Sequence, residues 1–301
     1  MASPALFTLC SCGVSMEDAA VTRSSIERHV SVPGPPKPSS LPCQLACTVR
    51  LVWTHADHLT ARRVAHDAGA LLLRLRAGLA NGRGSDPDAL RAAGDRQSHE
   101  LIIEKLAEAH PDDAVLSEEA PSGPERLDAP RVWIVDPLDG TREFGEADRS
   151  DWAVHVALVA EGRLVAGAVA LPALGMTLAT DRPPEPEGHA PERPRIVVSR
   201  TRPAQTATKL ADKLGGKLVP MGSAGAKAMA VIRNEADVYV HDGGQYEWDS
   251  AAPVAVAAAA GLHVSRLDGS PLAYNQPDPW LPDLLICRPE LAGSVRSALD
   301  D

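Results

Sequence analysis

The sequence has few aromatic residues: Phe, Tyr and Trp make up only 3% of its 301 residues, whereas hydrophobic residues reach an ordinary 44%. A close-packed core must therefore be built mainly from Ala, Val and Leu. The sequence also has no excess of basic residues, since its formal net charge is -10 at pH 7. Such a charge disfavours a nucleic-acid polymer or an anionic membrane as the main partner. A small anionic ligand is still compatible with it if metal ions reverse the local sign of charge.

Cysteine is scarce as well, and the 5 cysteines are too irregularly spaced to form a disulfide framework. Cys10, Cys12, Cys43 and Cys47 could in principle bind a metal together, but their spacings differ from the usual zinc patterns. We expect free thiols instead, as in a reducing cytoplasm. No apolar run approaches the roughly 20 residues of a membrane span. Met1–Val14 lacks the basic start of a signal peptide, so the sequence predicts a cytoplasmic location.

Pro, Ser and Gly divide the chain into segments of different character. Residues 1–50 are rich in Ser, Pro and Cys, a composition that predicts a flexible N-terminal arm. Residues 51–180 combine helical patterns with several strands and predict an α+β lobe. Residues 181–194 form a Pro-rich acidic loop, which predicts a boundary. Residues 195–301 alternate strand and helix patterns, which indicates a second lobe of the α/β class.

Periodicity locates the main elements of the first lobe. Apolar residues recur on one face from Leu59 onward, which predicts a long helix that ends in a Gly-rich segment. A second helix is predicted to end at Pro111, with Asp95 near its start as a cap or a first-turn carboxylate. Trp152–Val159 and Leu164–Ala170 are two strand patterns joined by a short turn, which predicts a hairpin.

The most informative stretch is Arg131–Phe144, with the sequence R-V-W-I-V-D-P-L-D-G-T-R-E-F. Val132–Val135 predicts a buried strand, and Asp136 follows it directly. We expect Pro137 to end the pairing of that strand. The next residues, L-D-G-T, predict a tight turn with a second carboxylate and a hydroxyl. Two carboxylates so close together repel each other unless a cation lies between them, and such oxygen ligands suit Mg²⁺.

Two other acidic segments lie near predicted element ends. Glu118 and Glu119 follow the short strand Ala114–Leu116, although paired Glu residues on a loop are usually just solvated. Asp249 precedes an Ala-rich helix, where on its own it would be read as an N-cap, with Pro253 in the first turn. Taken singly, each segment has an ordinary structural explanation.

Taken together, the motifs resemble those of the inositol monophosphatase-like superfamily of metal-dependent phosphatases. D-P-L-D-G-T-R-E-F matches its first signature and W-D-S-A-A-P its second, and the superfamily has an acidic pair at the place of Glu118 and Glu119. The resemblance spans about residues 59–298, and the N-terminal arm is generally absent from the family. Further segments resemble the CysQ branch, the 3'(2'),5'-bisphosphate nucleotidases, in its actinobacterial form: A-G-D-R-Q at 93–97, V-L-S-E-E-A at 115–120, G-S-A-G-A-K-A-M-A-V-I at 222–232 and S-R-L-D-G-S-P-L-A-Y-N-Q at 265–276.

The resemblance implies a fold and an activity. The fold would be α/β, a layered αβαβα sandwich of the sugar-phosphatase type, with the site in the cleft between the lobes. The activity would be magnesium-dependent removal of the 3'-phosphate from 3'-phosphoadenosine 5'-phosphate, and from its 5'-phosphosulfate form, within sulfate assimilation. Inhibition by lithium is implied too, and a homodimer is an option.

Other functions stay open at this point. An inositol monophosphatase or a fructose-1,6-bisphosphatase would use the same kind of metal site. A non-catalytic nucleotide sensor that kept the site is an alternative of another class. The sequence has no G-x-G-x-x-G between a strand and a helix and no G-x-x-x-x-G-K-[ST], which disfavours a nicotinamide dehydrogenase and a P-loop kinase.

Carried over residue by residue, the resemblance assigns metal-binding roles to five residues. The carboxylates of Glu118, Asp136, Asp139 and Asp249 and the main-chain carbonyl of Leu138 would bind two magnesium ions, with Asp136 bridging them. Because the phosphate would lie on these metals, Glu118, Leu138, Asp139 and Asp249 are expected at the substrate too. Two ions about 3.5–4 Å apart can clamp the entering and leaving oxygens of an in-line displacement.

The resemblance also assigns catalytic and substrate-binding roles. Glu118 and Thr141, held close together, would activate the attacking water, and Gly140 and Thr141 would offer backbone N–H groups to the phosphate. Asp95 matches an acidic residue linked to a third, weaker metal. The remaining candidates are Ser223 and Lys227 for the second phosphate or the ribose, and Arg142 and Arg266 for anion pairing.

Overall fold

The helices and strands of the first half build a five-stranded sheet with two long helices on one face. The computed structural model describes residues 53–300 apart from 81–85, 122 and 187, so the predicted arm and the four-cysteine set lie outside the described residues. The sheet has the order β1-β2-β3-β4-β5. Its elements are α1 (His55–Ala80), α2 (Pro87–Ala109), β1 (Ala114–Ser117), β2 (Arg131–Asp139), α3 (Thr141–Phe144), β3 (Ala153–Ala160), β4 (Arg163–Leu171) and β5 (Met176–Ala179).

Strand β2 is the centre of the site-forming region. It pairs in parallel with β1 and antiparallel with β3, and β3 and β4 form the predicted hairpin, which is confirmed. The expectation that Pro137 ends the pairing is wrong, because Asp139 still pairs with Ala153 on β3 after a register shift between Asp136 and Asp139. A bulge accommodates a proline that cannot donate to the ladder, and it redirects the side chains around it.

The second half contains another five-stranded sheet, with the order β10-β12-β8-β6-β7. Strand β6 lies parallel to both β7 and β8, as expected for alternating strands and helices. A two-stranded ribbon, β11-β9, lies outside this sheet. The elements are β6 (Arg195–Ser199), α4 (Gln205–Leu214), β7 (Lys217–Met221), α5 (Ala224–Ile232), β8 (Val238–His241), β9 (Gln245–Tyr246), α6 (Glu247–Ala259), β10 (His263–Ser265), β11 (Trp280–Leu281), β12 (Leu284–Cys287) and α7 (Ala292–Asp300).

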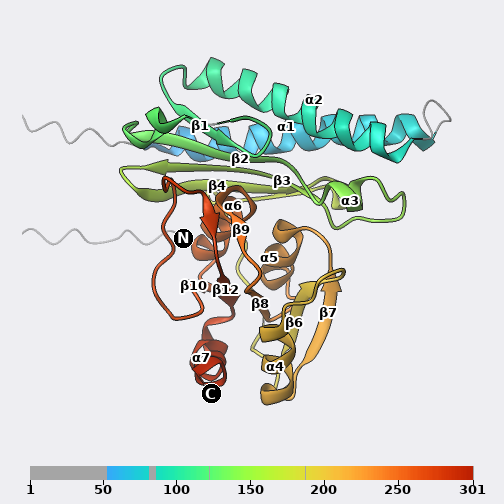
Figure 1. Cartoon of the computed structure of the whole chain (residues 1–301), viewed down its shortest axis with the longest axis vertical. Coiled ribbons are helices and arrows are strands. Elements are labelled where there is room, and N and C mark those ends of the chain that lie inside the picture. Colours follow the sequence, from blue (N-terminus) through green and yellow to red (C-terminus); the bar gives the residue numbers. More distant parts are fainter. Residues whose placement is uncertain (1–52, 81–85, 122, 187, 301) are drawn as a thin grey trace, which may run out of the picture. The chain divides into compact units, whose positions relative to one another are not determined.

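The elements stack in five layers. Helices α1 and α2 contact the first sheet, α5 and α6 lie between the two sheets, and α4 contacts both the second sheet and α7. Figure 1 shows this order from the two blue-green helices at the top to α4 and α7 at the bottom. The layered αβαβα sandwich expected from the resemblance is therefore confirmed. No helix among the described residues combines the length and the apolarity needed to cross a membrane.

Small side chains allow the layers to pack closely. The core between the sheets is rich in Ala and Val, and α6 supplies several fully buried alanines, including Ala251 and Ala252. On the facing strand β4, a Cβ added to Gly167 would lie 2.7 Å from the Cβ of Ala255. Helix α6 thus approaches the sheet more closely than larger residues would permit. A core that is poor in aromatic side chains can be densely packed only when its layers lie this close.

Two acidic residues occupy helix positions that differ from the expected ones. Helix α2 begins at Pro87 and is capped by Asp86, so Asp95 lies well inside it and is not a cap. Helix α6 begins at Glu247, which puts Asp249 at the third position and Pro253 inside the helix rather than in its first turn. The periodic pattern of apolar residues predicted both helices, but each helix begins upstream of the acidic residue that was expected near its start.

The contact between β4 and α6 gives a first prediction. Replacing Gly167 by Val should push α6 away from the sheet and destabilise the protein by about 2 kcal/mol. For a unit of this size the midpoint of thermal unfolding should fall by about 4–8 °C. Circular dichroism on heating measures it. The matched control is Gly293→Val on α7, where no atom of the described residues lies within 4 Å of an added Cβ. An equal loss in both variants would contradict the packing argument.

Candidate functional site

Three carboxylates from two distant segments of the chain converge next to the first sheet. Oxygen atoms of Asp136, Asp139 and Asp249 all lie within 4.8 Å of one another. Asp136 and Asp139 lie on either side of the bulge in β2, and Asp249 lies in the first turn of α6. Asp136 is 1% exposed and Asp139 is 7% exposed, so water can offset their charges only weakly. An oxygen-rich group of this kind could hold a metal ion.

Glu118 joins this group because β1 runs parallel to β2. The backbone N–H of Glu118 donates to the carbonyl of Val135 at 3.4 Å, which brings the end of β1 beside the end of β2. The carboxyl group of Glu118 lies close enough to that of Asp136 for each to raise or lower the pKa of the other. The structure therefore brings together the four acidic residues that the sequence analysis selected as metal ligands.

The four acids do not fit together as unpaired charges. Glu118 is exposed toward the surface, but partial loss of water around its carboxyl group, followed by repulsion from Asp249, raises its pKa to about 7. Burial and the neighbouring Glu118 and Asp139 raise the pKa of Asp136 well above its ordinary value. Burial and Asp139 raise the pKa of Asp249 to about 6. A divalent cation would relieve this repulsion, so the donor set fits a metal site.

Asp139 differs from the others because donors surround it. Its Oδ2 accepts hydrogen bonds from the hydroxyl of Ser223 and, at 2.6 Å, from the N–H of Gly225. Its Oδ1 accepts one from the N–H of Ala224 at 3.1 Å. Burial alone would raise the pKa of Asp139, but His155 and the other donors bring it to about 2. Asp139 therefore links the first sheet to the start of α5 as an ionised carboxylate.

His155 is a site residue that sequence reasoning missed. Its Nε2 lies 3.2 Å from Oδ2 of Asp139, and its Nδ1 lies 3.0 Å from the main-chain carbonyl of Trp248. The side chain is completely buried, and a Cβ added to Gly225 would lie only 2.0 Å from Nε2. A signal was present in the sequence, since His155 is the one polar residue of the apolar strand β3.

Asp95 and Thr141 face each other at the edge of the acidic group. The hydroxyl of Thr141 lies 3.2 Å from a carboxylate oxygen of Asp95 and 3.0 Å from the carbonyl of Leu138. Gly94 permits these contacts, because a Cβ there would lie 2.9 Å from the side chain of Leu138. Burial and the charge of Glu119 raise the pKa of Asp95 to about 6.

The turn that holds these groups depends on one glycine. Gly140 has φ +86°, a left-handed conformation that favours glycine. A Cβ there would lie 3.1 Å from the Cβ of Ser223. The backbone N–H of Leu138 donates to Asp136 at 3.0 Å, which fixes the carboxylate in the turn.

The residues expected to bind the rest of the substrate have different surroundings. Ser223 caps α5, and its hydroxyl accepts from the N–H of Ala226 at 2.9 Å. The amine of Lys227 donates to the carbonyls of Gly222 and, at 2.9 Å, Ser223. The expectation that Arg266 pairs with an anionic ligand is wrong, because its guanidinium holds both carboxylate oxygens of Asp283, at 2.8 and 2.6 Å. Arg142 is exposed on α3.

Space for a ligand adjoins the acids. An open cleft of about 390 Å³ is lined by the loop Ser117–Pro121 together with Trp248 and Pro279. Glu118 thus lines the cleft, and so does Trp248, the residue that precedes Asp249. Buried carboxylates, backbone donors and an open cleft are the parts that metal-assisted hydrolysis of a phosphate ester needs.

Comparison with curated sequences finds proteins of known activity that are similar to this chain. The 3'-phosphoadenosine 5'-phosphate phosphatase of Mycobacterium leprae is 50% identical over 249 residues, covering 78% of this chain and 90% of the relative. The 3'(2'),5'-bisphosphate nucleotidase CysQ of Escherichia coli strain K12 is 32% identical over 205 residues, covering 63% of this chain and 81% of the relative.

Comparison with solved structures and family models agrees with these relatives. The crystal structure of CysQ from Bacteroides thetaiotaomicron, a bacterial member of the inositol monophosphatase family, superimposes with a TM-score of 0.67 at 27% identity. The superposition covers 78% of this chain and 98% of that one. The model of the inositol monophosphatase family matches residues 56–298. The chain therefore belongs to the inositol monophosphatase family.

Proposed function

We propose that this protein is a magnesium-dependent phosphatase for 3'-phosphorylated nucleotides. It would hydrolyse 3'-phosphoadenosine 5'-phosphate to AMP and phosphate, and 3'-phosphoadenylyl sulfate to adenylyl sulfate and phosphate, within sulfate assimilation. The observation that carries the proposal is the convergence of Asp136, Asp139 and Asp249 on one buried point, beside Glu118. The mycobacterial relative that shares half of the aligned residues bears the name of this activity.

The metal ligands in this proposal are those the motifs selected. Glu118, Asp136, Asp139 and Asp249, with the carbonyl of Leu138, would hold two Mg²⁺ ions, and Asp95 would hold a weaker third. When bound, the ions would supply a water of lowered pKa and positive charge for the phosphate oxygens. The raised pKa values of Glu118 and Asp249 support this role, because a cation would replace the protons that these groups otherwise retain.

The protein's own groups would orient the reaction. Glu118 and Thr141, with Asp95 behind the hydroxyl, would hold the attacking water on one side of the phosphate. The backbone N–H groups of Gly140 and Thr141 would hold the phosphate oxygens. In an in-line displacement the leaving oxygen departs on the opposite side from the water. That side is expected at Asp139, which accepts hydrogen bonds from the start of α5.

The nucleoside is therefore expected near the second sheet. Ser223 would contact the ribose or the second phosphate, and the ammonium of Lys227 would add positive charge there. We also propose that residues 51–180 act as the metal-binding lobe and residues 195–301 as the substrate lobe, joined by the loop 181–194. The separate sheets of the two segments support this division. Asp249 is the exception, since it reaches the metal site from the second segment on α6.

A substrate panel tests the activity. Phosphate release should be fastest from 3'-phosphoadenosine 5'-phosphate, with a kcat/KM about tenfold or more above inositol 1-phosphate and fructose 1,6-bisphosphate. Release should stop in EDTA and return with Mg²⁺. A preference for a sugar phosphate would contradict the proposed substrate, and phosphate release in EDTA would contradict the proposed metal-dependent mechanism. Tight nucleotide binding without release from pH 6 to 9 would favour the non-catalytic sensor.

Asp139→Asn tests the metal site. The amide keeps the shape of the side chain but removes the charge, so kcat/KM should fall by about 10³-fold or more. The matched control is Asp283→Asn, which removes a charge of the Arg266 ion pair and should leave kcat/KM unchanged. Near-normal activity of Asp139→Asn, measured at saturating Mg²⁺, would exclude a role of this carboxylate in the reaction.

The raised pKa values predict a pH-dependent response to metal. The folded structure raises the pKa values of Glu118, Asp249 and Asp95 to about 7, 6 and 6, from ordinary values of 4.5, 3.8 and 3.8. The folded state thus binds more protons than the unfolded state between about pH 4 and 7, so the metal-free protein loses stability as pH rises through this range. Asp139, with its lowered pKa, titrates below this window.

Mg²⁺ should therefore raise the midpoint of thermal unfolding more at pH 8 than at pH 5, because it relieves a repulsion that protons relieve at low pH. Thermal scans with and without 5 mM MgCl₂, at roughly constant ionic strength, measure the shift. An Na⁺ salt is the control for screening. Equal shifts at the two pH values would mean that the cation does not act at these carboxylates.

A further inference from the structure

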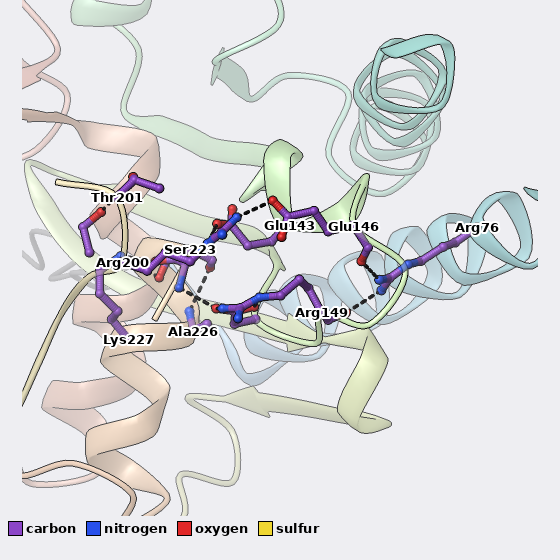
Figure 2. Close-up of polar contacts among 12 residues, drawn as sticks. Arg76, Glu143, Glu146, Arg149, Arg200, Thr201, Ser223, Ala226 and Lys227 are labelled. Carbon is purple, nitrogen blue, oxygen red and sulfur yellow. Dashed lines mark hydrogen bonds and ion pairs between the residues drawn. The ribbon is translucent and has the colours of Figure 1, made fainter. Parts of the chain in front are cut away.

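The turn Met221–Ser223, which joins β7 to α5, is held by polar groups on almost every side (Figure 2). The buried amine of Lys227 donates to the carbonyls of Gly222 and Ser223. The N–H of Gly222 donates to a carboxylate oxygen of Asp151 at 2.5 Å. The carbonyl of Met221 accepts from the N–H of Arg200 at 3.0 Å. A turn fixed at successive peptide groups has little freedom to shift.

This turn determines how Asp139 is held. Its last residue, Ser223, donates its hydroxyl to Asp139, and the two following N–H groups, of Ala224 and Gly225, donate to the same carboxylate. Oδ1 of Asp139 receives only the longest of these bonds, 3.1 Å from Ala224. That oxygen therefore retains a lone pair for a cation, provided that the turn stays in place.

Charged residues from the first sheet's side support the same turn. Asp151, just before β3, is held by Arg149, whose Nε donates to it at 2.8 Å. Glu143 on α3 accepts from Nε of Arg200 at 2.6 Å. A Cβ added to Gly222 would lie 2.4 Å from Cγ of Glu143, so the turn rests directly on that side chain. Figure 2 shows Glu143, Arg149 and Arg200 gathered around the turn.

Lys227 faces the turn and not open solvent. Its side chain is 5% exposed, and the amine lies 5.5 Å from the centre of the Tyr239 ring. The positive charge also interacts favourably with Asp139, Asp249 and Asp151. An ammonium has three donors, and two of them are used by the carbonyls of Gly222 and Ser223. Its main contact is thus with the protein's own backbone.

We propose that Lys227 and Asp151 are positioning residues for the metal site. Lys227 holds the two carbonyl groups of the Gly222–Ser223 turn, and Asp151 holds the N–H group of Gly222. The turn then keeps Asp139 in the orientation that binds metal. The inference rests on the proposed metal site but not on the identity of the substrate. It gives Lys227 a role that is complete before any nucleotide binds.

The test is metal binding by the substrate-free protein. Isothermal titration with Mg²⁺, and Mn²⁺ binding followed by electron paramagnetic resonance, should give dissociation constants about tenfold higher in Lys227→Met and in Asp151→Ala. Asp151→Asn keeps an oxygen acceptor for the N–H of Gly222 and should bind metal like the wild type. The Mg²⁺ concentration for half-maximal activity should shift in parallel in both variants, while the KM of Asp151→Ala for the nucleotide at saturating Mg²⁺ stays within about twofold.

Arg266→Met is the control, because it likewise removes a cation that is held by protein groups, and its ion pair with Asp283 does not touch the turn. Its metal affinity should not change. Wild-type metal affinity in both Lys227→Met and Asp151→Ala would overturn the inference and leave the proposed function standing. A raised KM for the nucleotide with unchanged metal affinity would overturn it too, and would assign Lys227 to direct substrate contact. A wild-type protein that binds no divalent metal would overturn the proposed function itself.

Discussion

Repulsion among clustered carboxylates is the constraint on which the rest of the site depends. Asp136 is almost completely buried, Asp249 is half-buried and Glu118 reaches the open cleft, yet each retains a proton at higher pH than usual because its carboxyl group loses water and the three lie so close together. Asp136 and Asp249 each accept a backbone hydrogen bond as well. Only for Asp139, however, do the neighbouring donors, which come from α5 and from His155, outweigh burial and bring the pKa below its ordinary value. A fold tolerates such a cluster when something else compensates for it, and here divalent cations are the natural compensation.

The architecture explains how these acids are kept together. Parallel pairing of β1 with β2 brings Glu118 beside Asp136. The bulge at Pro137 lets one strand present two carboxylates to the same point. Close packing of α6 against β4, which depends on Gly167 and the small side chains facing it, brings Asp249 within reach. The shortage of large aromatic side chains and the site are thus connected, because bulky residues between the sheets would hold Asp249 away.

Local patterns and motifs could predict much of this arrangement. The hairpin β3–β4, the strand–helix alternation of the second half and the four clustered acids follow from periodicity and from two signatures. Helix starts were harder to predict: Asp95 lies inside α2 because Asp86 and Pro87 supply the cap and first position. Arg266 was expected to pair with an anionic ligand, but its guanidinium instead forms an ion pair with Asp283 from another segment of the chain. Pairings of this kind depend on long-range packing, which a local pattern does not encode.

The sequence by itself determined which chemistry the protein can carry out, since carboxylates, a Gly turn and a hydroxyl at fixed spacing favour a metal and a phosphate. Tertiary structure alone decided how these groups are held. His155 between two aspartates, the Thr141–Asp95 contact and the bond from Gly222 to Asp151 each join residues from different segments of the chain. The physical reason is that a hydrogen bond or a charge contact acts over a few ångströms in space, whatever the distance along the sequence.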